Sequence, residues 1–262
     1  MPLKLGKPPV VEAWIEFRFN VNEETPWTEA IAHDFLDTAL GGRYKVRDFV
    51  GRADVVFDTQ GGTPSVKEAK LLFERIRAVG GEHQDRYIQV GRGALVVNLC
   101  KVNEWAGFNA LSQEAMEAFG KFRDFFKPHA LNAAAIHYRD VVEIPWPDDR
   151  QLELRDYMEL YMEIPADRFG QTSSFNMSCS LVNTAVDGVL TIAVRREQPP
   201  DTDSQQRPLR LVMDWNITTR PSVASLDADN ITAWLQNAHN EIEKVFRHAF
   251  TDKGWALFQP ME

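Results

Sequence analysis

Two glutamates and a tryptophan share one side of the most regular strand pattern near the N-terminus. Between Val10 and Asn20 apolar and polar residues alternate, which places Glu12, Trp14 and Glu16 on the same side of a strand. Two carboxylates on one face can act as general acid and base, or hold a cation between them. The alternative is a solvated face on which Arg18 neutralises a glutamate, and surface charges more often have that role.

A second polar group lies in the middle of the chain, in a strand predicted over Ala133–Ile144. Alternation puts His137 and Arg139 on one face of this strand and Tyr138 and Asp140 on the other. A histidine beside a carboxylate can transfer protons near neutral pH. The alternative is a cross-strand ladder of ion pairs. If His137 and Arg139 join the two glutamates of the first strand, they form a possible polar site for a phosphorylated small molecule.

A third group is basic. Arg43, Lys45 and Arg47 alternate on one side of a predicted strand, and Arg52 follows beyond a predicted turn. Such a stripe suits a phosphate backbone or an acidic protein partner. It equally suits a charged edge strand that resists aggregation.

Several common catalytic and ligand-binding motifs are absent. The chain has no His-Glu-x-x-His, no Cys-x-x-Cys, no phosphate-binding Gly-x-x-x-x-Gly-Lys loop, no Gly-x-Ser-x-Gly elbow and no dinucleotide-binding glycine fingerprint. We therefore expect no metal and no cofactor. Cys100 and Cys179 lie far apart in apolar segments and are predicted to be buried thiols in a reducing compartment.

The overall composition narrows the class of protein. The chain has 262 residues, 29 Lys and Arg against 38 Asp and Glu, and a formal charge of −9. Apolar residues make up 44% and charged residues 26%, which is ordinary for a globular protein and excludes a disordered tail or a membrane bundle. The first residues lack the apolar run of a signal peptide, so a cytoplasmic location is expected. The net acidity argues against binding nucleic acid without sequence preference.

The elements that must position these residues follow an order that repeats. In the first half the pattern predicts a strand, a helix ended by Gly41-Gly42, a meander of short strands and a long helix. The predicted segments are 10–20, 27–40, 44–50, 53–57, 71–79, 87–90, 94–100 and 107–127. The second half repeats this order, with a helix over 152–162 and a last helix that is capped by Asp227 or Asp229 and ended by Gly254. Its predicted strands are 133–144, 173–181, 188–195 and 209–219.

This order predicts an α+β protein of two tandem units, residues 1–144 and 145–262, with sheets covered by long helices. The arrangement is similar to TATA-binding-protein-like and helix-grip folds, a likeness that carries no function by itself. The alternative is one continuous α+β body.

Two segments at opposite ends of the chain carry a resemblance to a known family. Residues 8–19, with the pattern Pro-Pro-Val-Val-Glu-Ala-x-Ile-Glu-Phe-Arg-Phe, and the Trp-Leu-x-x-Ala-His-x-x-Ile segment that opens residues 234–250 resemble a sporadically distributed family of uncharacterised bacterial proteins. That family carries an Arg-Tyr-x-Asn element in its middle strand, of which only Tyr138 is matched here. The family implies no established activity, and its patchy distribution implies mobile or defence-associated gene neighbourhoods.

These observations lead to three hypotheses of function. We expect a non-catalytic interaction module that binds a protein partner in a bacterial defence, toxin-control or regulatory assembly, with Trp14 as an interface residue. The first alternative is a nucleic-acid-binding module that uses Arg43, Lys45, Arg47 and Arg52. The second is an enzyme in which Glu12, Glu16, His137 and Arg139 converge. A homo-oligomer is compatible with all three, and no membrane partner is expected.

Overall fold

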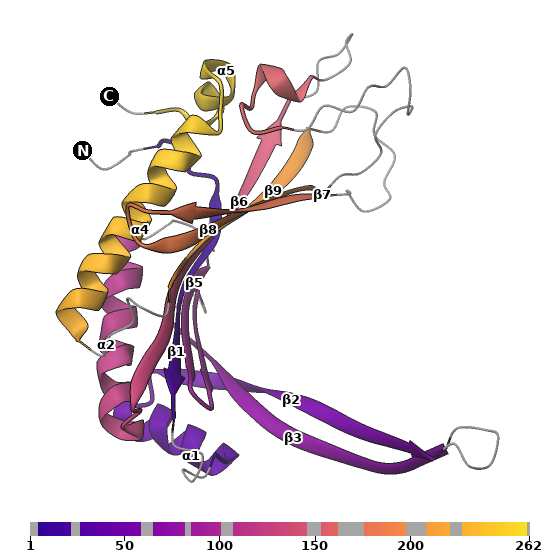
Figure 1. Cartoon of the computed structure of the whole chain (residues 1–262), viewed down its shortest axis with the longest axis vertical. Helices are drawn as coiled ribbons and strands as arrows, with labels where there is room; N and C mark the ends of the chain where they lie inside the picture. The colour runs from indigo at the N-terminus through magenta and orange to yellow at the C-terminus, as the bar shows by residue number, and fades with distance from the viewer. Residues whose placement is uncertain are drawn as a thin grey trace.

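The alternation of apolar and polar residues produces an α+β protein built on one open antiparallel sheet, with helices packed against it (Figure 1). The computed structural model describes residues 5–21, 27–58, 65–81, 85–100, 107–145, 153–161, 176–197, 208–220 and 227–260, and the backbone alone at 46, 47, 52–58 and 65–72. Nine strands lie within these ranges: β1 Val10–Asn20, β2 Tyr44–Asp58, β3 Ser65–Gly80, β4 Arg86–Gly91, β5 Ala94–Cys100, β6 Ala130–Ile144, β7 Asn176–Asn183, β8 Gly188–Arg196 and β9 Leu209–Thr219.

The strand order across the sheet is β2-β3-β4-β5-β1-β6-β9-β8-β7. The two strands that open the predicted halves, β1 and β6, therefore lie side by side at the centre and pair antiparallel. Because β6 also pairs with β9 over ten residues, the strands on either side of the predicted boundary at residue 144 belong to one continuous sheet.

The helices gather on the convex face of the curved sheet (Figure 1). Their bounds are α1 Glu29–Asp34, continued by the π turn η1 Phe35–Ala39, then α2 Phe108–Phe126, η2 Leu154–Asp156, α4 Ala228–His248, α5 Asp252–Trp255 and η3 Ala256–Phe258. Helix α2 packs on β1 and β5, α4 packs on β6 and β9, and the two helices contact each other. The other face of the sheet is concave and carries none of the described helices.

The core lies between this layer of helices and the sheet. Each long helix buries one stripe, such as Ile231, Leu235, Ala238 and Ile242 on α4, because residues three and four apart share a face. Strand β1 contributes alternate residues, and the ring of Phe17 lies 5.0 Å from that of Phe119 on α2.

The structure corrects three expectations about elements. The turn predicted between residues 50 and 53 is absent, because Gly51 lies at a bulge within the continuous strand β2, and Arg52 belongs to that strand. The helix predicted over 152–162 is reduced, in the described residues, to the short turn η2. Gly254 does not end the last helix, because α4 stops at His248 and Gly254 lies within α5. Of the two predicted caps, Asp227 and Asp229, Asp227 is the N-cap of α4.

His239, on the apolar side of α4, is half-buried among aromatic side chains. Nδ1 of His239 is 2.9 Å from the hydroxyl of Tyr138, and its ring stacks on Phe108. Cys100 and Cys179 are unpaired thiols, and both are half-buried. No helix in the described ranges is long and apolar enough to cross a lipid bilayer.

Candidate interaction surface

The polar residues predicted from the two central strands meet on the concave face. In β1 the alternate residues Ala13, Ile15 and Phe17 are buried beneath the helices, which turns Glu12 and Trp14 toward the opposite side. In β6 the same alternation buries Tyr138 and Asp140 and leaves alternate residues on the concave side. Because β1 pairs with β6, Glu12 lies opposite Arg139, and Trp14 lies opposite His137.

The centre of this surface is a stacked pair of rings. The planes of Trp14 and His137 are 8° apart and their centroids are separated by 4.5 Å. The amide nitrogen of Asn216 is 2.9 Å from Nδ1 of His137, and Nε2 of His137 is 3.7 Å from a carboxylate oxygen of Glu16. Burial lowers the pKa of His137 to about 4, despite the opposing effect of Glu16. The imidazole is therefore neutral at pH 7, where Asn216 can donate to Nδ1.

Arg139 joins the neighbouring charges into one network. Its Nε donates to Asp214 at 2.7 Å, its terminal nitrogen donates to Glu12 at 3.1 Å, and its guanidinium lies 5.7 Å from the Trp14 ring centroid. Asn98 donates to the second oxygen of Glu12 at 3.1 Å. Both carboxylate oxygens of Glu12 are thus held by partners from other strands.

Two further arginines complete the balance of charge. Arg195 on β8 pairs with Asp214, and Arg18 donates to Glu16 at 2.6 Å. We define the central cluster as Trp14 and His137 with the ion-paired residues around them, namely Glu12, Glu16, Arg18, Arg139, Arg195 and Asp214. Three carboxylates face three guanidinium groups in this cluster, so its formal charge is zero while His137 is neutral.

The four residues predicted as a possible polar site are all in this cluster, and they come from two strands more than 120 residues apart in sequence. Their partners Asp214, Asn216, Asn98 and Arg195 were not predicted. The signal for two of them was the alternation within β9, where Asp214 and Asn216 interleave with buried Met213, Trp215 and Ile217. The register that aligns them with β6 is not visible in the sequence.

The predicted basic stripe is not a continuous row of free cations. Arg43 precedes β2 and forms two hydrogen bonds to Glu117 on α2, at 3.0 and 3.1 Å. Lys45 is exposed, and a register shift between Tyr44 and Val46 interrupts the simple alternation. The side chains of Arg47 and Arg52 lie outside the described residues.

Two titratable groups on the concave face have shifted pKa values. The depressed pKa of His137 makes it a weak base near neutral pH. Burial raises the pKa of the Cys100 thiol, beside Glu12 on the same face, to about 11, so this thiol is protonated at pH 7. Within the described ranges, no group of three His, Cys, Asp or Glu residues is arranged to hold a metal ion.

Comparison with protein-family models and with curated proteins finds no match to this chain.

Proposed function

We propose that this protein is a non-catalytic interaction module whose concave sheet face binds a protein partner. The single observation that carries the proposal is the central cluster: a half-buried tryptophan and histidine stack surrounded by three acid–arginine pairs. Tryptophan and arginine dominate the energetics of protein interfaces. Ion pairs prearranged on one partner orient the other and discriminate against wrong partners.

The same charge balance disfavours a phosphate backbone as the ligand of this cluster. Arg18, Arg139 and Arg195 are each bound to a carboxylate. A phosphate would have to displace those carboxylates, or bind with them close by. Binding to nucleic acid draws its affinity from cations that release counterions, and a surface of zero net charge offers little of that term.

We also propose that the chain is a tandem repeat of two α+β units, similar to the TATA-binding-protein-like arrangement. From the centre outward the order is β1-β5-β4-β3-β2 on one side and β6-β9-β8-β7 on the other. In each half the strands are followed by a long helix, α2 or α4, on the same face of the sheet. In this arrangement the second unit begins with β6, ahead of the boundary after residue 144 that was expected from the sequence, and the Trp14–His137 stack lies at the junction of the units. A partner centred on this stack would contact both.

The proposal is tested by site-specific photo-crosslinking in the native host. Gln89 on β4 and Thr191 on β8 lie in register with Glu16 and His137 respectively, so a photoreactive residue at either position samples the concave face. Gln236, exposed on α4, is the matched control on the helical face. We expect one protein to be captured from both concave positions and not from α4, and lost when Trp14→Ala is added.

Equal capture from position 236, or recovery of the chain alone from every position, would count against a binding role for the concave face. The stability of Trp14→Ala is checked by urea unfolding, so that loss of capture is not confused with loss of the fold. Arg139→Glu, which places a third acid between Glu12 and Asp214, should abolish capture as well, by reversing one charge of the network.

Nucleic-acid binding is a second candidate because of one specific feature, the long β2–β3 arm that projects from the body (Figure 1). The two strands carry seven Lys and Arg residues against five Asp and Glu, a basic excess in an acidic chain. If the arm binds RNA or DNA, the affinity must fall steeply as salt rises, because counterions are released on binding. Affinity that is unaffected by salt would exclude this candidate.

A further inference from the structure

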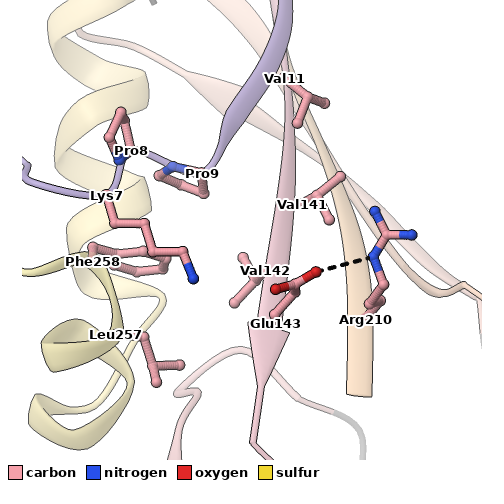
Figure 2. Close-up of a pocket in the computed structure, with 10 residues that line it drawn as sticks. All are labelled: Lys7, Pro8, Pro9, Val11, Val141, Val142, Glu143, Arg210, Leu257 and Phe258. Carbon is pink, nitrogen blue, oxygen red and sulfur yellow. Dashed lines mark ion pairs between the residues drawn. The ribbon is translucent and has the colours of Figure 1, made fainter. Parts of the chain in front are cut away.

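A pocket of about 240 Å³ opens where the central strands separate (Figure 2). Its walls come from the N-terminal segment before β1, the end of β6, the start of β9 and the C-terminal turn η3. The apolar part of the lining consists mainly of Pro8, Pro9, Val11, Val142, Leu257 and Phe258. The volume suits a small apolar group of a few carbon atoms.

The pocket exists because β6 extends beyond the point where its pairing with β1 starts. Val10, the first residue of β1, pairs with Asp140, whereas β6 runs on to Ile144. The amide of Val141 donates to the carbonyl of Pro9, and beyond Pro9 the N-terminal segment turns away from β6. There Gly6 and Lys7 donate to the carbonyls of Gln259 and Phe258. Pro8 and Pro9 have no N–H groups. Strand β6 nevertheless continues to Ile144, so its last residues keep a partner strand on the β9 side alone.

This geometry leaves one backbone donor of β6 facing the pocket side. In an antiparallel ladder alternate residues direct their N–H and C=O groups to the same side. Val141 donates toward β1, so Glu143 points its N–H in the same direction. The described part of the chain provides no backbone acceptor there. An unpaired strand edge of this kind commonly accepts an additional peptide segment.

Some of the charged groups around the pocket form ion pairs with one another, and one does not. The carboxylate of Glu143 is 3.5 Å from Arg210, and Arg210 also pairs with Glu197 at 2.7 Å. Lys7 is exposed and forms no ion pair within the described residues. In Figure 2 the Lys7 side chain extends across the pocket toward Glu143. One ammonium and one amide N–H are thus available beside an apolar wall.

We propose that this pocket binds an apolar group that ends in a carboxylate. The carboxylate lies between the Lys7 ammonium and the Glu143 N–H, and the apolar body packs against Leu257, Phe258 and Val142. Hydrogen bonds to an ionised acceptor are among the stronger ones in proteins. A free carboxylic acid and the C-terminal residue of a peptide share this chemistry. The proposal is independent of the function assigned to the concave face.

The test measures binding of two pairs of probes by titration calorimetry on the full chain. The first pair is 4-methylpentanoate and its amide, and the second is the tripeptide Ala-Ala-Leu with a free or an amidated C-terminus. We expect the carboxylates to bind with roughly millimolar dissociation constants, as befits ligands of this size, and the amides to bind at least about tenfold more weakly. Tighter binding of the tripeptide identifies a peptide C-terminus as the ligand, and equal binding identifies a free acid.

Two variants locate the site. Lys7→Gln should weaken carboxylate binding about tenfold, whereas Lys45→Gln, the same change of charge at an exposed position on β2, should leave it unchanged. Leu257→Trp fills the pocket from a half-buried position and should abolish binding, with its fold verified by thermal unfolding. Amides that bind as well as the acids, or an affinity unaffected by Lys7→Gln, would overturn the proposal, as would the absence of binding by either carboxylate.

Discussion

The carboxyl group of Asp140 offers a quantitative test of how the sheet and helices pack. This residue is 2% exposed on the helical side of β6. One of its oxygens accepts a hydrogen bond from Nε1 of Trp215 at 2.8 Å, and the other has no hydrogen-bond partner. Burial raises the pKa of Asp140 to about 7, although the Trp215 bond opposes the shift. A buried carboxylate with one free oxygen is costly in its ionised form.

The sign of the effect follows from proton linkage. The unfolded chain loses this proton near pH 3.8 and the folded chain near pH 7. Between these values the folded state holds one more proton, so the free energy of unfolding falls by about 1.4 kcal/mol per pH unit as pH rises. The whole penalty approaches about 4 kcal/mol above pH 7. Asp140→Asn keeps an acceptor for Trp215 and removes the charge. Its buried amide costs about 2 kcal/mol, which leaves a net gain of about 2 kcal/mol at about pH 8.

The assay is urea unfolding followed by tryptophan fluorescence at about pH 5, 6, 7 and 8. The variant should gain about 2 kcal/mol relative to the native protein between about pH 5 and 7, and little more above that. The comparison uses this difference because His137, whose pKa is lowered, contributes an opposite slope to both proteins. Asp124→Asn, at an exposed aspartate, is the control. If Asp140→Asn shows no pH-dependent gain in stability, water reaches the carboxylate, and Asp140 is not buried between the sheet and the helices.

Three further substitutions test separate parts of the structure. His137→Asn should be less stable than the native protein at neutral pH. This deficit should shrink by about 1.4 kcal/mol per pH unit as pH falls from about 6.5 to about 4, because the native imidazole resists protonation and the native protein loses stability there. Urea unfolding measures the deficit, and a deficit that does not change with pH would contradict this. Tyr44→Phe should lower the free energy of unfolding by about 2 kcal/mol, since the buried hydroxyl donates to Glu114 at 2.5 Å, and thermal unfolding measures it. Gly93→Ala should cost about 2 kcal/mol or more, because φ is +69° and a Cβ would lie 2.6 Å from a backbone oxygen of β1. The matched control is Gly42→Ala, with a similar φ of +64° and open space. Equal losses at the two glycines would show that the contact with β1 is unimportant.

Most secondary-structure elements could be predicted from the amino-acid sequence. The alternation in residues 10–20 and 209–219 predicted the strands β1 and β9, and the apolar stripe beginning at Phe108 predicted α2. These predictions succeeded because side-chain periodicity depends on neighbours within one element. They failed where context overrides local preference. Gly51 could equally mark a turn or a bulge, and the partner strand β3 selects the bulge.

The composition of the central cluster depended on tertiary structure. The sequence showed that Trp14 and Glu12 lie on the same side of one strand, and that His137 and Arg139 lie on the same side of a second strand. Only the pairing of β1 with β6 turns these into one surface, and only the register of β9 brings Asp214 to Arg139. Whether Arg43 is free or neutralised was likewise decided by α2, which carries Glu117. Periodicity determines the side of its own strand on which a side chain lies. Strand order and register depend on packing between residues that are distant in the chain, so only the tertiary structure determines which charged side chains pair.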